Sequence, residues 1–472
     1  MVAYKPLQES SAFRLWCKAH DLNIKEYDEI AKNLENYEND PKWKDLIEGS
    51  KKFRGVIESV APSPCFPAGT LVQTSTGYKE IQNIQRGDYV LTHKNEFKKV
   101  LNTMNRHSDK AVELTFQGSA PFATTPNHPF YIRHKEGTIR KKNKEGVFTS
   151  KRKFSDPEWV HAEDIKKGDY VGIAINQNSI IPTWNGVHDC GINKDIKNID
   201  VKNPDFWWII GRYFGDGWSQ KYTCKNGNVG YYRFIICCNK NNNDEEYITR
   251  KIKSIGFKYS VTKERTVKKI TVSSKELFIF VDQFGHGAKN KRLTNTIFDL
   301  PVNLLRNFLE GYFSADGHYI KDTKKEVYST ISKELAYGIE QCVYKVYHTP
   351  CAMRTKNGQK TQIEGRIVNT NTAYDVRFKF EPGRSDQGFY ENGYMWLPFR
   401  SMKTIDYDGT VYNLSVQDDE SYTVNNFIVH NCSFLLSNDK ISEMVGLIKV
   451  GEEICCCLDG YNCDVYKFLK ND

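Results

Sequence analysis

The sequence predicts a multidomain fold, in which an all-β domain built from two separated segments surrounds an inserted α+β domain with two pseudo-symmetric halves. Short runs of alternating apolar and polar residues fill residues 65–185 and return in residues 394–431, as is typical of strands. Between them, residues 195–385 contain one helical pattern twice, each copy followed by strand patterns. Residues 1–64 and 432–472 remain as short flanks of mixed character, and 472 residues are enough for more than one core.

The N-terminal flank predicts helices followed by a strand. Apolar residues follow helical spacing through residues 13–16 and again near Trp43 and Ile47, and residues 51–57 then alternate like a strand. The first residues lack the apolar core of a signal peptide, and no apolar run is long enough to cross a bilayer. We therefore expect a cytoplasmic protein with no membrane partner. The 13 cysteines are an odd number without C-x-x-C pairs, which favours reduced thiols over disulfides or zinc.

The first β segment contains an internal repeat. Residues 81–88 and 159–169 resemble each other, and each ends in Gly-Asp directly before a strand pattern. This repeat indicates a partial duplication. In the second segment, residues 396–400 and 409–416 predict two more strands. We expect both segments to close one domain.

The repeated helical patterns of the insert span residues 203–217 and 300–317, and each ends in Asp-Gly. Small residues lie four apart in both, which places them on one helix face and allows close packing: Gly211 with Gly215, and Gly311 with Ala315.

Such packing would bring Asp216 and Asp316 together at the two helix C-termini. The helix dipole disfavours a carboxylate at a helix C-terminus by about 0.3–1 kcal/mol, and the second carboxylate repels it as well. A divalent metal ion would relieve both effects. Two ordinary amphipathic helices that end in Asp-Gly are the alternative.

Positive charge is concentrated in the insert. Residues 195–385 contain 32 Lys and Arg against 20 Asp and Glu, whereas the whole chain has a net charge of only +9. This distribution favours a polyanionic partner, and the alternative is a solvated basic surface. Three strand patterns carry alternating basic residues that could follow the major groove of DNA. We select Arg233, Lys268, Lys269, Arg377 and Lys379 as DNA-binding residues, with the three lysines as candidates for either catalysis or plain phosphate contacts.

Reactive residues stand at two distant points of the chain. The side-chain amide of Asn431 could attack its own carbonyl carbon and cut the chain before Cys432, with His430 beside it to assist. The thiol of Cys65 could attack the carbonyl carbon of Pro64 and form a thioester, which Cys432 could capture. Two thiols and one Asn therefore suffice to excise everything between them.

These junctions, together with the internal Thr125-Pro126-Asn127-His128, resemble a self-splicing intein, whose splicing domain has the pseudo-symmetric all-β Hint fold. The resemblance implies that Cys65, Cys432 and Asn431 react, and that His430 assists Asn431. It also implies that His128 protonates the departing amide nitrogen, that Thr125 holds the scissile peptide, and that splicing needs no cofactor. The chain departs from the family in having Asn413 where an Asp is common, no His in residues 418–422, and Pro64 before the junction.

The two helical patterns resemble the LAGLIDADG homing endonucleases in their single-chain form, although Phe214 and Ser314 replace the first Asp of the motif. This resemblance implies a monomer that cuts both strands of a long DNA site, the uninterrupted host gene by family analogy. Asp216 and Asp316 would hold Mg²⁺.

The flanks look like a fragment of the alpha subunit of bacterial DNA polymerase III, on residues 53–56 and 468–472. The resemblance implies a host polymerase assembly as partner after splicing, but the flanks carry no polymerase acids that we can identify. Two alternatives remain for the whole chain. One is a splicing element with an inactive, DNA-binding or inert insert, and the other is a domain that cleaves itself without ligation.

Overall fold

The computed structural model describes residues 2–6, 9–20, 22–52, 57–142, 148–184, 199–239, 244–363, 366–381 and 387–431. The fold is mostly β with some helices. The expectations for residues 53–56 and for the flank 432–472, Cys432 included, lie outside this part of the chain. Among the helices described, none has the length and apolar character needed to cross a membrane.

The N-terminal flank contains three short helices, as the pattern predicts, beside a strand pair. The strand expected at residues 51–57 was placed too early, because Lys51 still ends a helix and the strand begins at Ile57. The helices pack around a small core that includes Phe13, Trp43 and Ile47. Strand β1 pairs antiparallel with β2. The elements are β1 (Val2–Pro6), α1 (Glu9–Ala19), α2 (Ile24–Lys32), the 3-10 turn η1 (Leu34–Tyr37), α3 (Lys44–Lys51) and β2 (Ile57–Pro62).

The two β segments share one 14-stranded network. The first contributes β3 (Phe66–Pro67), β4 (Leu71–Thr74), β5 (Gly77–Glu80), β6 (Tyr89–Leu91), β7 (Phe97–Phe116), β8 (Phe122–Thr124), β9 (Pro129–Lys142), β10 (Phe148–Phe154), β11 (Glu158–His161) and β12 (Asp169–Ala174), with 3-10 turns η2 (Ile81–Asn83) and η3 (Ala162–Asp164). The second contributes β23 (Phe389–Glu391), β24 (Tyr394–Val416), β25 (Ser421–Val424) and β26 (Phe427–His430).

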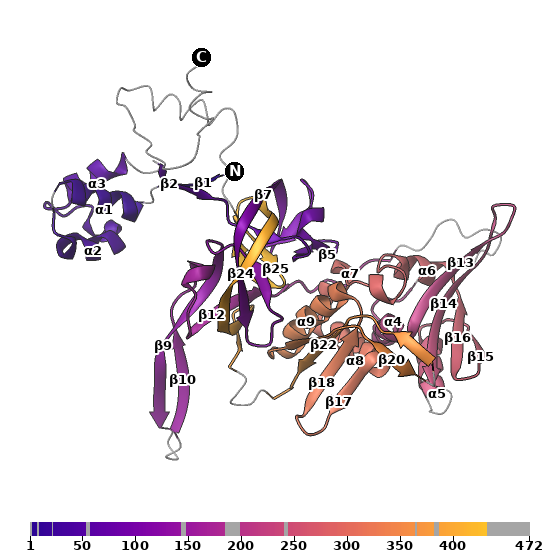
Figure 1. Cartoon of the computed structure of the whole chain (residues 1–472). Helices are drawn as coiled ribbons and strands as arrows, with labels where there is room; N and C mark the ends of the chain where they lie inside the picture. The colour runs from indigo at the N-terminus through magenta and orange to yellow at the C-terminus, as the bar shows by residue number, and fades with distance from the viewer. Residues whose placement is uncertain are drawn as a thin grey trace. The chain divides into compact units, whose positions relative to one another are not determined.

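Strand β24 joins the segments because it pairs with β7 from Phe399↔Phe116 to Val416↔Val100 (Figure 1). The sequence pattern predicted strands at residues 396–400 and 409–416, and both stretches are extended in β24. The structure has one long strand, whose register shifts between Asp406 and Gly409 interrupt the alternation that a sequence pattern detects.

The two repeated stretches, residues 81–88 and 159–169, have the same local structure. In each, a 3-10 turn leads to a glycine with positive φ, +99° at Gly87 and +107° at Gly168. The following aspartate then accepts a hydrogen bond from the backbone N–H three residues before it, at 3.0 Å for Asp88 and 2.9 Å for Asp169. The predicted repeat is therefore confirmed at the level of these turns.

The insert has two halves of matching order. Each half has a four-stranded antiparallel sheet, β13-β14-β16-β15 in the first and β17-β18-β22-β19 in the second. The first half comprises α4 (Pro204–Asp216), β13 (Gly217–Thr223), β14 (Val229–Asn239), α5 (Asp244–Ser254), β15 (Ser260–Lys263), β16 (Val267–Ser273) and α6 (Lys275–Asp282). Turn η4 (Ala288–Asn290) and helix α7 (Asn295–Phe298) lead to the second half, which comprises α8 (Val302–Asp316), β17 (Gly317–Ile320), β18 (Lys325–Thr330), α9 (Lys333–Tyr347), β19 (Ala352–Lys356), β20 (Lys360–Ile363), β21 (Arg366–Asn369) and β22 (Ala373–Phe378).

Helices α4 and α8 pack with their backbones in contact. A Cβ atom built on Gly211 would lie 1.9 Å from the Phe308 carbonyl oxygen, and one on Gly311 would lie 2.0 Å from that of Trp208. Only glycine fits at these two positions. The close packing predicted from the spacing of small residues is therefore confirmed.

Candidate active sites

The N-terminal junction is buried and held by reciprocal hydrogen bonds. The backbone N–H of Cys65 donates to Thr125 Oγ1 at 2.9 Å, and the N–H of Thr125 donates to the Cys65 carbonyl at 3.0 Å. The Cys65 thiol donates to the carbonyl oxygen of Ser63 at 3.3 Å. Thr125 therefore contacts the nitrogen of the Pro64–Cys65 peptide, where the sequence pattern expects it.

His128 lies at the turn that leads into β9, with its ring centroid 4.1 Å from that of Phe66, the neighbour of Cys65. The side chain is fully buried, and neither ring nitrogen has a hydrogen-bond partner among the described residues. Burial, with a smaller repulsion from His430, holds the pKa of His128 well below its usual range. The imidazole is therefore neutral at pH 7.

The C-terminal junction lies beside the same turn, because β26 pairs with β9 through Val429↔Phe130. His430 ends β26, and its Nδ1 lies 2.7 Å from the carbonyl oxygen of Asn431. Its Nε2 lies 3.9 Å from the Glu420 carboxylate. The sheet thus brings together junctions that are more than 360 residues apart in the sequence.

Asn431 is buried and held at its backbone and its side chain. Its N–H donates to the Glu420 carbonyl at 2.8 Å. The amide orientation that satisfies its neighbours has the side-chain nitrogen donating to the same carbonyl and the oxygen accepting from the Val416 N–H, both at 2.8 Å. The next residue, Cys432, lies outside the described residues.

Asn413 is a site residue whose position the sequence does not reveal. The sequence shows it only as a departure from the family, yet its side-chain nitrogen donates to the Pro64 carbonyl oxygen at 2.6 Å. The pairing of β24 with β3, Tyr412↔Phe66, sets this contact. Local spacing could not have found this contact, since the two residues are 349 positions apart.

The two acids lie at the adjoining ends of α4 and α8. A Cβ atom on Gly215 would lie 3.3 Å from the Asp316 carboxylate. Burial and then repulsion by Asp216 raise the pKa of Asp316 to about 6. Burial also raises the pKa of Asp216, and the neighbouring Arg212, whose guanidinium donates to Asp216 Oδ2 at 2.8 Å, opposes that rise.

Lys291 is a second residue that the sequence pattern did not reveal. Its buried ammonium donates to three carbonyls at the end of α4, those of Tyr213 at 2.7 Å, Phe214 at 2.9 Å and Gly217 at 2.7 Å. Burial lowers the pKa of Lys291 to about 8, although the two acids nearby attract its charge. The ammonium therefore completes the C-terminus of the helix that carries Asp216.

The acid pair fits a hard divalent cation. In the described part of the chain, no group of three or more His, Cys, Asp or Glu side chains could hold a metal ion. Mg²⁺, however, is commonly bound through one or two carboxylates, with water and phosphate oxygens in its other positions. Asp216 and Asp316 would supply such carboxylates, and Arg212, which already donates to Asp216, would compete for the first of them.

The basic candidates differ in their surroundings. Lys268 pairs with Glu245 at 2.8 Å, Lys269 pairs with Glu264, and Arg377 pairs with Asp375 at 2.6 Å. Arg233 lies over the ring of Tyr231 at 3.9 Å, and Lys379 follows the end of β22. Three of the five candidates are thus already paired with acidic side chains.

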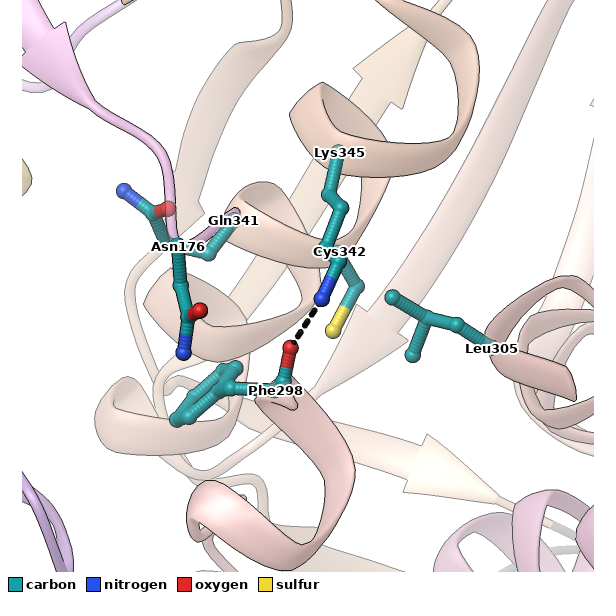
Figure 2. Close-up of a pocket in the computed structure, with 6 residues that line it drawn as sticks. All are labelled: Asn176, Phe298, Leu305, Gln341, Cys342 and Lys345. Atoms are coloured by element: carbon teal, nitrogen blue, oxygen red, sulfur yellow. Dashed lines mark hydrogen bonds between the residues drawn. The ribbon is translucent and has the colours of Figure 1, made fainter. Parts of the chain in front are cut away.

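A small hollow beside α9 does not form a ligand site. Figure 2 shows Lys345 directed at the carbonyl of Phe298, to which its ammonium donates at 2.5 Å. The hollow leaves no space for even a water molecule. Lys345 therefore ties α9 to the end of α7.

A family model, curated relatives and a solved structure show what this chain is similar to. Residues 70–431 match the intein splicing domain family. The chain is 28% identical over 445 residues to the ATP-dependent DNA helicase Hel308 of Thermococcus kodakarensis, covering 82% of this chain and 38% of the helicase. It is 25% identical over 389 residues to an iron-sulfur cluster assembly SufBD family protein of Mycobacterium tuberculosis, covering 78% of this chain and 43% of that protein.

The chain thus spans less than half the length of these two relatives. Among solved structures, mesophilic variants of the homing endonuclease I-DmoI align with a TM-score of 0.29 at 16% identity, covering 37% of this chain and 88% of that one. Because the family match extends over most of the sequence, this chain belongs to the intein splicing domain family.

Proposed function

We propose that residues 65–431 excise themselves and join Pro64 to Cys432, so that residues 1–64 and 432–472 become one host chain. The proposal rests on one observation. The Cys65 junction and the His430-Asn431 junction lie at the same buried turn, although they are far apart in the sequence.

In the first step, the Cys65 sulfur attacks the carbonyl carbon of Pro64. The neutral ring of His128 accepts the thiol proton and returns it to the Cys65 nitrogen as the C–N bond breaks, which leaves a thioester and a free amine. Thr125 holds that nitrogen through the hydrogen bond from the Cys65 N–H.

In the later steps, the Cys432 thiol attacks the thioester and releases the thiol of Cys65. The side-chain nitrogen of Asn431 then attacks its own carbonyl carbon, forming a succinimide and freeing the amine of Cys432. His430, with Nδ1 at 2.7 Å from that carbonyl oxygen, polarises it. The freed amine finally attacks the thioester carbonyl and restores a peptide bond.

Intact-mass spectrometry of the purified chain under reducing conditions tests this proposal. We expect a 105-residue ligated product and a free 367-residue insert. Asn431→Ala should abolish ligation, whereas Asn102→Ala, at an exposed asparagine of β7, should leave it unchanged. Full ligation by the Asn431→Ala chain would contradict the proposal. Cleavage without the 105-residue product would favour the alternative, self-cleavage without ligation.

We further propose that the insert cuts both strands of DNA. The close packing of α4 and α8, which brings Asp216 and Asp316 near each other, supports this second activity. A Mg²⁺ ion held by these acids would activate water and stabilise the leaving oxygen. Arg233, Lys268, Lys269, Arg377 and Lys379 would contact the phosphates, and we infer that the insert acts as a monomer.

A plasmid that joins the coding sequences of residues 1–64 and 432–472 is the substrate for the test. We expect Mg²⁺-dependent linearisation, lost in Asp216→Asn and kept in Asp322→Asn, an exposed acid outside the pair. Cutting by the Asp216→Asn protein would contradict the role of the acids. Binding without cutting by the unmodified chain would support the alternative of a DNA-binding, inactive insert.

We propose a replicative polymerase as the host, on the resemblance of the flanks alone. The spliced 105-residue product would then bind a host polymerase assembly. Co-purification of that product, without the insert, with DNA polymerase III subunits would support this assignment.

A further inference from the structure

We propose that Asn413 is a catalytic residue of the first splicing step, in which its amide donates to the oxyanion that forms on Pro64. This inference rests on the proposed splicing function. Asn413 is fully buried in β24, and its side-chain nitrogen lies 2.6 Å from the carbonyl oxygen of the scissile peptide. It therefore touches the atom that gains negative charge when the Cys65 sulfur attacks.

The neighbours of Asn413 fix which end of its amide faces Pro64. Its side-chain oxygen accepts two hydrogen bonds, from the Tyr422 hydroxyl at 2.6 Å and from the Leu414 N–H at 2.7 Å. A backbone N–H can only donate, so the oxygen must face Leu414 and the nitrogen must face Pro64. Tyr422 is fully buried as well, and it acts as a positioning residue.

This arrangement favours the transition state over the ground state. A donor directed at a carbonyl oxygen is worth more once that oxygen is charged, and more in a dry pocket than in water. An ionised aspartate, the common family residue at this position, has no proton to donate. The asparagine therefore supplies at all pH values a hydrogen bond that an aspartate could give only when protonated.

The test isolates the first step. In an Asn431→Ala, Cys432→Ala background, dithiothreitol should release the 64-residue N-terminal fragment from the thioester. Removing one oxyanion donor typically slows a reaction by about 10²–10³-fold, and we expect Asn413→Ala to slow fragment release by about 10²-fold. Val411→Ala, which disturbs another fully buried position of β24 but keeps the Asn413 amide, should change the rate by less than about threefold.

Two further variants separate catalysis from folding. Asn413→Asp should be slow at pH 8 and recover relative to the parent at pH 5.5, where a buried carboxyl is protonated and can donate. Tyr422→Phe should slow release by less than Asn413→Ala. In a Cys65→Ala background, cleavage at Asn431 should be unaffected by Asn413→Ala, because that reaction does not involve the Pro64 carbonyl.

Parent-like release by the Asn413→Ala protein would overturn the inference. Equal slowing at both junctions would also overturn it, since a purely structural role predicts that result. The rate of the Asn413→Asp protein relative to the parent could also be the same at pH 5.5 and pH 8. That result would count against a hydrogen bond from residue 413 to the Pro64 oxyanion. If the parent background itself releases no fragment with dithiothreitol, the proposed splicing function fails, and the inference fails with it.

Discussion

The splice junction and the acid pair differ in how they treat charge. Around Cys65, the groups are buried and His128 is neutral, and hydrogen bonds fix the scissile peptide. At the ends of α4 and α8, two carboxylates repel each other, and Asp216 keeps 38% of its side-chain surface exposed.

This difference follows from where each substrate comes from. The splicing substrate is part of the chain, so folding itself places the scissile peptide in a dry site. The entropy lost in ordering that peptide is part of the free energy of folding. In the proposed nuclease, DNA and a metal ion would arrive from solution, so the second site would have to stay open, and its two carboxylates would attract the cation. A buried neutral site and an exposed charged site should therefore respond differently to metal, charge and pH.

Metal removal should separate the two sites most strongly. Excess EDTA should lower DNA cutting by more than about 10³-fold, because the proposed reaction needs a divalent cation to activate water. Splicing should change by less than about twofold, since its steps use only protein groups. Gel assays of both reactions on one preparation make the comparison. A splicing rate that falls with EDTA would contradict the proposed difference between the two sites.

Lys291→Met should produce the next largest effect. The substitution leaves three carbonyls at the end of α4 without their donor, at a cost of about 3 kcal/mol in the free energy of unfolding. Hydrogen exchange should speed up in α4 and α8 and stay unchanged in β7 and β24. Lys289→Met, at an exposed lysine of η4, serves as control. Equal stability of both variants would show that the buried ammonium is not needed.

The pH dependence of stability should reveal the acid pair. The pKa of Asp316 is about 6 in the folded chain and about 4 when unfolded, so between these values the folded state binds more protons. Without metal, the contribution of Asp316 to stability should therefore fall as pH rises from about 4 to 6. Asp316→Asn should remove this dependence and stabilise the chain at pH 7 by about 1 kcal/mol, a modest gain because solvent screens the repulsion.

Chemical denaturation in EDTA at pH 4.5 and pH 7 measures the effect. Asp322→Asn is the matched control because it removes an exposed acid from the same half. A difference in stability between the Asp316→Asn protein and the unmodified chain that is the same at both pH values would contradict the role given to Asp316.

What the sequence could predict depended on local spacing. The alternation in residues 65–185 and the small residues four apart in α4 and α8 are short-range patterns, and both led to the observed structure. The contact of Asn413 with Pro64 could not be predicted in this way, because it depends on the register of β24 against β3.

Lys291 shows the same limit for the insert. It lies between the two repeated patterns and belongs to neither, so the repeat does not identify it as a site residue. It nevertheless contacts the end of α4. The merging of two predicted strands into β24 has a related cause. The pairing with β7 holds residues 394–416 extended through register shifts that break the alternation.

The smallest predicted effect concerns the C-terminal junction, where the family's common helper His is absent from residues 418–422. The Glu420 carboxylate lies 3.9 Å from His430 Nε2, while Nδ1 faces the Asn431 carbonyl. The Asn431 carbonyl orients the ring through Nδ1, whereas the Glu420 carboxylate lies beyond hydrogen-bond distance and is half exposed, so its effect is weak. Glu420→Gln should slow cleavage at Asn431 by about twofold to fivefold, measured in a Cys65→Ala background. The backbone carbonyl of Glu420 still holds Asn431 in this variant. A fall in the cleavage rate of more than about 10²-fold would therefore mean that the carboxylate takes part in proton transfer. A charged group would then act at a junction that we describe as working through neutral groups.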